Sequence, residues 1–344
     1  MKNLNILILI LSVLLFTSCS KEEDIPVVVD PLTPGVLVLN EGQFGKNTAS
    51  VTFKSTDGVI VQEFFKSTNQ RALGDVLNSV MESDDAYYLV VNVSGKIEKV
   101  SKSDMKSIAT YNGLTSPRYM VEHKDKGYIS NLKFDTTDNP IDLFNLNLNQ
   151  KENSISVQGW CEEMIVFENR IYIANTGKHQ LLVADLPLTG DFEKYDLPKE
   201  PMNLKIDKNG MIWILCSGGY SYGQNQAALC LFNPNTKSVE SVMKFSNPFA
   251  FPSELCIDAS GEYLYFLSNG VYKMSITDTE IPKEPLIVNH LYFYGLGIDP
   301  KTNEIYVGDA MDAQSKGSVF VYSEMGTIIE SFEVGYFPNG FIFR

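Results

Sequence analysis

The sequence predicts an all-β protein, a seven-bladed β-propeller, from two observations. First, a unit of two short apolar strands joined by a tight polar turn recurs about every 40 to 50 residues. Second, the last unit is split, with its first strand at the C-terminus and its second strand close to the N-terminus. The residues that open the first strands are Leu73, Pro117, Cys161, Pro201, Pro252, Phe293 and Pro338.

Each unit follows the same pattern of an apolar strand, a turn, and a second strand that ends in a polar residue. In one unit, Leu204-Lys205-Ile206 leads through Asp207-Lys208-Asn209-Gly210 to the strand 211–217. Gly, Asn and Asp tolerate the positive φ angles that tight hairpins need. The other turns lie at 83–85, 124–127, 168–170, 258–261 and 299–303.

The split unit predicts how the ring closes. The segment Pro338–Arg344 supplies a first strand and then the chain ends, whereas Gly35–Asn40 supplies a second strand with no partner before it. Pairing the N- and C-terminal strands closes one blade and leaves no open sheet edge around the ring. A solenoid would instead need distinct capping repeats at its two ends.

The blade topology also sorts the loops between two faces. If the strands of each blade are ordered from the axis outward, the tight turns lie on one face and the longer connections on the other. The longer connections are 41–48, 132–140, 217–226, 245–252, 289–294 and 309–317. Loop length costs little stability, and such loops commonly carry function. We call the face with the longer connections the top face.

The N-terminus resembles a lipoprotein export signal. Met1-Lys2 precedes an apolar run that is too short to span a bilayer, and Thr17-Ser18 directly precedes Cys19. This predicts a signal peptide at 1–18, a lipidated Cys19 and a tether at 19–34 before a propeller at 35–344. An ordinary signal peptide with a chance cysteine is the alternative interpretation.

The tether begins with an acidic run, Lys21-Glu22-Glu23-Asp24, and then becomes rich in proline. It resembles the acidic tag that directs lipoproteins of Bacteroidetes-type bacteria to the outer face of the outer membrane. The implied localisation is the cell surface, with the lipid as the sole membrane attachment. The alternative is a plain solvated tether.

Composition limits the partners. The chain holds 28 Lys and Arg against 42 Asp and Glu, a formal net charge of −14. A chain with this net negative charge is repelled by the phosphate backbone of nucleic acids, so no nucleic-acid partner is expected. The remaining cysteines show no metal-type spacing. We expect buried thiols, with one disulfide as an open alternative, at Cys161, Cys216, Cys230 and Cys256.

The top face is unusually aromatic, which is typical of a binding surface for a flat or partly apolar ligand. Some of these rings are expected instead to plug the ends of the propeller as core. The glycine-rich segment 216–223 carries two of the tyrosines. The aromatic candidates for ligand binding are Phe44, Tyr119, Trp160, Tyr220, Tyr222, Phe251, Tyr292, Tyr294 and Phe337.

Polar residues end the second strands and form a second candidate set. They are Asn40, Asn92, Asn131, Asn175, Ser217, Asn269 and Asp309. Such residues commonly cap strand ends and start turns. The functional alternative is a ring of amides around the axis, and from it Asn92, Asn131 and Asn175 join Arg118 as candidate ligand contacts. Other polar first-strand residues expected near the channel mouth are Asp75, Glu163, Asn203, Glu254 and Asn339.

The sequence offers no catalytic constellation. Its three histidines show no spacing suited to a metal or to a general base, and neither a nucleophile elbow nor a phosphate loop occurs. We therefore expect no enzyme, no cofactor and no metal. The main alternative to this expectation is a divalent ion held by carboxylates and amides at the channel mouth, as in propeller lactonases.

Three stretches resemble signature segments of a Bacteroidetes family of YncE-like seven-bladed propeller lipoproteins. They are residues 39–45 (LNEGQFG), 91–98 (VNVSGKIE) and 114–119 (LTSPRY). The resemblance spans the chain after the tether and is densest in its first third. Members of that family include surface lipoproteins that bind cobalamin (vitamin B12) and cap its TonB-dependent transporter.

The resemblance implies a surface protein that captures a corrinoid on the top face and passes it to a TonB-dependent outer-membrane transporter. Two other classes stay open: a metal-dependent, lactonase-like hydrolase, and an adhesion protein that binds glycans or proteins. The small-molecule partner implied is cobalamin, and the protein partner implied is the transporter.

Overall fold

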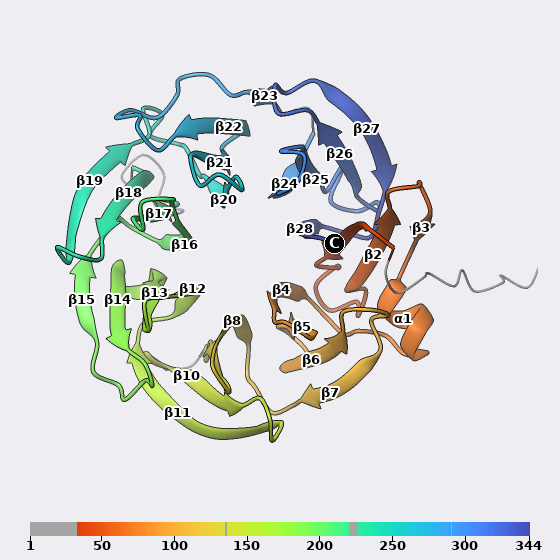
Figure 1. Ribbon diagram of the computed structural model, residues 1–344, viewed down its shortest axis with the longest axis horizontal. Coiled ribbons are helices and arrows are strands. Elements are labelled where there is room, and N and C mark those ends of the chain that lie inside the picture. The colour runs from red at the N-terminus through yellow and green to blue at the C-terminus, as the bar shows by residue number, and fades with distance from the viewer. Residues whose placement is uncertain (1–32, 135, 220–225, 290) are drawn as a thin grey trace, which may run out of the picture.

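Seven four-stranded antiparallel sheets surround a common axis and form the propeller that the sequence predicts (Figure 1). The computed structural model describes residues 33–134, 136–219, 226–289 and 291–344. From the axis outward, the blades are β28 (Pro338–Phe343), β1 (Gly35–Asn40), β2 (Ser50–Ser55), β3 (Ile60–Val61); β4 (Leu77–Glu82), β5 (Ala86–Val91), β6 (Lys96–Ser101), β7 (Ser107–Tyr111); β8 (Pro117–His123), β9 (Lys126–Asn131), β10 (Asp138–Asn145), β11 (Gln150–Gln158); β12 (Cys161–Phe167), β13 (Arg170–Asn175), β14 (Gln180–Asp185), β15 (Glu193–Asp196); β16 (Pro201–Ile206), β17 (Ile212–Cys216), β18 (Ala228–Asn233), β19 (Ser238–Lys244); β20 (Ser253–Ile257), β21 (Tyr263–Leu267), β22 (Gly270–Ser275), β23 (Ile287–Val288); and β24 (Phe293–Ile298), β25 (Ile305–Asp309), β26 (Ser318–Tyr322), β27 (Ile328–Glu333).

The predicted closure is confirmed by the pairing of the two terminal strands. Strand β28 pairs antiparallel with β1, so that Ile342 lies opposite Leu37 and Pro338 lies opposite Asn40. The last residue of β1, Asn40, therefore lies beside the start of β28, and the first residue of β1, Gly35, lies beside the end of β28. The two ends of the described chain consequently share one blade near the axis (Figure 1).

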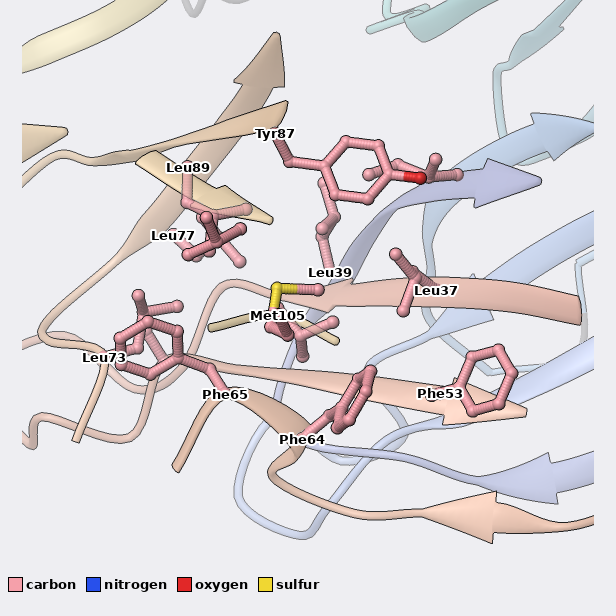
Figure 2. Packing of buried hydrophobic residues seen from close by; sticks show 14 of the residues in the cluster. Leu37, Leu39, Phe53, Phe64, Phe65, Leu73, Leu77, Tyr87, Leu89 and Met105 are labelled. Atoms are coloured by element: carbon pink, nitrogen blue, oxygen red, sulfur yellow. The ribbon is translucent and has the colours of Figure 1, made fainter. Parts of the chain in front are cut away.

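The cores lie between neighbouring blades rather than in one central mass. Figure 2 shows the largest of these clusters, in which Leu37 and Phe53 of the closing blade pack with Leu77 and Leu89 of the next blade. Another cluster joins Trp213 of β17 to Leu255 of β20, in the following blade. Each second strand is almost fully buried on both faces, which explains why these strands read as continuous apolar runs rather than as alternating ones.

One helix interrupts the repeat, and the sequence pattern did not indicate it. Strand β3 is only two residues long, and α1 (Phe64–Asn69) follows it. Phe64 and Phe65 of α1 are buried in the cluster between the first two blades (Figure 2). The side chain of Asn69 donates to the carbonyl of Met105, in the turn between β6 and β7. The helix thus covers the sheet edge that the short outer strand leaves.

The first complete blade begins later than expected. Its inner strand starts at Leu77, whereas Leu73 lies in the connection that follows α1 and is buried in the same cluster. A short 3-10 helix, η1 (Thr176–Lys178), joins β13 to β14. Within the part of the chain that the structure describes, no helix is long and apolar enough to cross a membrane. The signal segment and residues 19–32 of the tether lie outside the described residues.

Candidate functional site

All seven inner strands have a β-bulge near their N-terminal end. The pairing register with the second strand shifts within the first residues of each inner strand. Such a bulge leaves residues unpaired and re-aims their side chains. The residues that the ladders skip are Asn78, Arg118, Tyr119, Glu162, Glu163, Met202, Glu254, Leu255, Tyr294 and Asn339.

These bulges line a cavity of about 850 Å³ at the top of the axis, which we call the axial cavity. Bulge residues of six inner strands reach it, and Glu41, directly after β1, joins them. The bulge residues in its lining are Asn78, Arg118, Tyr119, Met202, Glu254, Tyr294 and Asn339. A smaller hollow of about 560 Å³ lies away from the axis, between β11 and the blade of β14 and β15. The axial cavity is the better candidate because aromatic and charged groups converge in it.

Aromatic side chains from two neighbouring connections form the outer part of the axial cavity. The connection from β19 to β20 contributes Phe249 and Phe251, and the connection from β23 to β24 contributes Tyr292. Phe251 and Tyr292 are each 44% exposed. Tyr292 packs edge-on against Tyr294, with ring centroids 5.8 Å apart. Open aromatic faces at the rim of a hollow are suited to stacking against a flat ligand.

Two ion pairs fix the axial part of the site. The guanidinium of Arg118 lies 3.0 Å from a carboxylate oxygen of the buried Glu162. Lys205 lies 2.6 Å from Glu163, whose other oxygen accepts from the backbone N–H of Leu204 at 2.9 Å. Both pairs join an inner strand to the next one, β8 to β12 and β12 to β16. Their partial burial makes removal of one partner costly.

Two carboxyl groups in the cavity lining lack a cation of their own. Glu41 accepts a hydrogen bond from the hydroxyl of Tyr294, and burial raises the pKa of Glu41 despite that bond and the nearby Arg118. Burial, followed by repulsion from Glu163, raises the pKa of Glu254 to about 8. No hydrogen bond or ion pair to the Glu254 carboxyl occurs within the described residues.

Among the ten bulge residues, Glu254 is the one whose backbone has a positive φ. Its φ is +56°, in the left-handed region that disfavours side chains with a Cβ. A residue other than glycine or asparagine costs about 1 kcal/mol or more in this conformation. The chain keeps a glutamate there, at the start of the bulge in β20, and strained positions of this kind concentrate at functional sites.

The predicted asparagines are used by the fold. Asn92 donates to Ser116 and to the carbonyl of Pro117, in the connection to the next blade. Asn131 accepts from the N–H of Ser116 and donates to Asp142. Asn175 donates to the carbonyl of a residue at the end of β11. All three are buried and none lines the axial cavity. Their amides hold neighbouring segments together, as the capping interpretation expects.

The aromatic candidates that the structure describes divide into three groups. Tyr119, Phe251, Tyr292 and Tyr294 line the axial cavity together with Arg118. Phe337 packs against Tyr294, with ring centroids 5.3 Å apart, from outside the lining. Phe44, which is 79% exposed, and Trp160 lie on the surface away from the cavity. Tyr220 and Tyr222, like the lipidation residue Cys19, lie outside the described residues.

Sequence reasoning missed several lining residues. Glu41 was visible only as part of a loop, and Asn78 and Met202 carry no chemical signal by themselves. Phe245 and Phe249 lie in a top-face connection that the sequence did single out. The general signal was present, since each missed bulge residue stands at the second position of a first strand. Whether such a residue faces the cavity depends on a shift in strand register, and no residue type predicts that shift.

Metal ligands do not gather in the part of the chain that is described. No group of three or more His, Cys, Asp or Glu side chains there is arranged to hold a metal ion. At the axis the carboxylates of Glu162 and Glu163 are occupied by Arg118 and Lys205. The four cysteines of the propeller are free thiols, at Cys161, Cys216, Cys230 and Cys256.

Comparison with known proteins identifies the family. A family described as a domain of unknown function, DUF5074, matches residues 34–344. The chain belongs to this family. No curated protein matches it.

Solved structures share its fold at low sequence identity. A quinonprotein alcohol dehydrogenase-like protein from Bacteroides thetaiotaomicron is 16% identical, with a TM-score of 0.71 over 92% of this chain and 79% of that one. A periplasmic gluconolactonase from Pseudomonas aeruginosa is 11% identical, with a TM-score of 0.68 over 90% and 98%. A functionally unknown protein from Desulfotomaculum acetoxidans is 11% identical, with a TM-score of 0.67 over 90% and 99%. These likenesses concern the fold alone.

Proposed function

We propose that the protein binds a corrinoid, with cobalamin as the leading candidate, in the axial cavity and passes it unchanged to a TonB-dependent outer-membrane transporter. The observation that carries the proposal is the division of the cavity into two chemically different parts. Its outer part is aromatic, with Phe251 and Tyr292 half-exposed. Its axial part is polar, with the amides of Asn78 and Asn339 beside charged groups.

A corrinoid matches this division. It is a large, flattened macrocycle whose edge carries amide side chains. Its faces and its nucleotide base would pack against the aromatic rim, and its amides would pair with the polar groups near the axis. The cavity is open and holds about 850 Å³, so one edge of such a ligand would enter while the remainder stays over the top face.

A rigid frame supports capture rather than turnover. The axial lining residues stand on inner strands, each of which is paired with the second strand of its own blade and packed against neighbouring blades, so little order has to be gained there on binding. Polar contacts also link inner strands directly, as where Asn339 donates to the carbonyls of Leu77 and Asn78 at 3.0 and 3.1 Å. A preformed site of this kind favours high affinity.

The cellular part of the proposal rests on the sequence. A lipidated Cys19 followed by the acidic tag would hold the protein at the outer surface, where a ligand too large for diffusion pores must first be captured. Transfer to a transporter would then be a handover between two proteins in one membrane. Protease treatment of intact cells tests the localisation, because a protein that survives this treatment intact does not face outward.

Calorimetric titration with cyanocobalamin tests the binding. The native chain is expected to bind cyanocobalamin at micromolar protein concentrations or below. The double substitution Phe251→Ala with Tyr292→Ala is expected to weaken binding at least tenfold, which corresponds to about 1.4 kcal/mol. The matched control is Tyr263→Ala, whose tyrosine is 37% exposed at the opposite end of the propeller, and it should bind as the native chain does. Absence of binding by cyanocobalamin, adenosylcobalamin and cobinamide alike would refute corrinoid capture.

A second candidate is a lactonase-like hydrolase. The observation in its favour is the shared fold with a periplasmic gluconolactonase, together with the two carboxyl groups of Glu41 and Glu254 in the cavity. Hydrolysis of gluconolactone by the purified protein, measured with and without added Ca²⁺ or Mg²⁺, decides between the two. Turnover that Glu254→Gln abolishes would replace capture with catalysis.

A further inference from the structure

We propose that Glu254 is the specificity-determining residue of the axial cavity, and that it holds a carboxamide group of the ligand by a pair of hydrogen bonds. This deepens the proposed function, since it names the part of the ligand that the axial part of the cavity recognises. It also stands apart from the corrinoid assignment, because any flat ligand with a carboxamide edge would be recognised in the same way.

The first step of the argument is the pattern of contacts among the inner strands. Side chains bridge one inner strand to the next at most junctions: Asn339 reaches β4, Asn78 donates to the carbonyl of Arg118 in β8, and Arg118 reaches β12. From β12, Glu163 is held by Lys205 of β16. In the described residues no such hydrogen bond or ion pair continues from β16 to Glu254 on β20. Glu254 thus faces the cavity with its bonding capacity unused.

The second step is the charge around that carboxyl. Glu163 on β12 and Glu41 after β1 repel its ionised form, while Lys205 on β16 attracts it but is already paired with Glu163. Tyr294 on β24 and Tyr119 on β8 also feel its charge, and the thiol of Cys256 lies on the same strand. The carboxyl groups of the axis therefore outnumber its cations, and a neutral Glu254 relieves the imbalance.

The third step is the chemistry of a neutral carboxyl. A protonated carboxylic acid has one O–H donor and one carbonyl acceptor. A primary amide has the complementary N–H donor and carbonyl acceptor, so the two groups can form two hydrogen bonds in a single ring. A ligand carboxylate would instead add another negative charge. An ammonium group would need Glu254 ionised, against the repulsion of Glu163 and Glu41. The raised pKa of Glu254, about 8, places the neutral form at physiological pH.

Three matched aromatic probes test the recognition without assuming a corrinoid: benzamide, benzylammonium and benzoate, each titrated against the full chain by ligand-observed NMR. Benzamide is expected to bind most tightly. Its apparent dissociation constant should rise above pH 8, approaching tenfold per pH unit as Glu254 ionises. Preference for benzylammonium, or no detectable binding of benzamide, would overturn the proposal.

Two substitutions separate recognition from structural support. Glu254→Gln keeps an amide-complementary group, so benzamide should still bind at pH 7 but lose its pH dependence. Glu254→Leu removes both hydrogen bonds and should weaken benzamide about tenfold. The control is Glu122→Gln, because burial also raises the pKa of Glu122, at the opposite end of inner strand β8. A pH dependence that survives in Glu254→Gln would assign it to another group and overturn the proposal.

Cyanocobalamin then distinguishes this inference from the proposed function. If benzamide binds through Glu254 but no corrinoid binds or displaces it, corrinoid capture fails and carboxamide recognition stands. If cyanocobalamin binds with the same affinity to the native chain and to Glu254→Leu, corrinoid capture stands and the role of Glu254 in recognition is overturned.

Discussion

The closing blade makes a quantitative prediction at Ile342. This side chain is 5% exposed in β28, lies opposite Leu37 of β1 and packs in the cluster of Figure 2. Ile342→Ala removes three buried carbons, worth about 2.4 kcal/mol at roughly 0.8 kcal/mol each. The space left behind adds to this, so the free energy of unfolding should fall by about 3 kcal/mol.

Denaturation by guanidinium, followed by the fluorescence of the buried Trp213, measures this change. Ile329→Ala is the matched control, because Ile329 is 53% exposed on the outermost strand β27, and its effect should stay within about 0.5 kcal/mol. Deleting residues 341–344 should be more damaging still, since it opens the edge of β1. Equal denaturation midpoints for the two alanine variants would refute the view that the terminal strand holds the ring closed.

Four further outcomes are expected. Arg118→Leu leaves the buried Glu162 without its cation and should lower the free energy of unfolding by about 3 kcal/mol, measured by the same denaturation. Glu254→Gln should gain stability over the native chain as the pH rises from about 4.5 to about 8, by at most about 1.4 kcal/mol per pH unit, and the difference should level off above that; equal pH profiles would contradict the raised pKa. The four propeller thiols should react with Ellman's reagent at pH 8 only after unfolding, since three are buried and burial raises the pKa of the half-buried Cys256 to about 12; rapid reaction of the native protein would contradict this. Cys19→Ala should abolish palmitate labelling in growing cells, and labelling that persists would contradict lipidation at this residue.

Much of the fold was predictable because it depends on signals that repeat. Turns such as 207–210 recur with the same residue types, and the two half-units at the termini complement each other. The structure confirms both the seven blades and their closure. The helix α1 was not predictable, because it follows a shortened outer strand in one blade and its two phenylalanines repeat nowhere else.

The site was predictable only in part. Aromatic residues in long loops indicated the face at which the axial cavity lies, and Arg118, Tyr119, Phe251, Tyr292 and Tyr294 do line that cavity. The asparagines could not be assigned from sequence, because an amide that ties two blades together looks the same as one that faces a ligand. The cavity floor depends on bulges, and a one-residue shift in register exchanges the two faces of a strand.

The pairing of β1 with β28 also fixes the direction from which a membrane anchor would pull. Gly35 lies beside the end of β28, whereas Asn40 and Glu41 lie at the cavity end. A chain anchored through Cys19, as the sequence predicts, would therefore be attached on the side away from the axial cavity. The intervening residues span at most about 50 Å when fully extended. Under the proposed function, an anchor on that side would leave the open cavity facing the surroundings for capture, and the propeller would have to reorient before a bound ligand met a transporter in the same membrane.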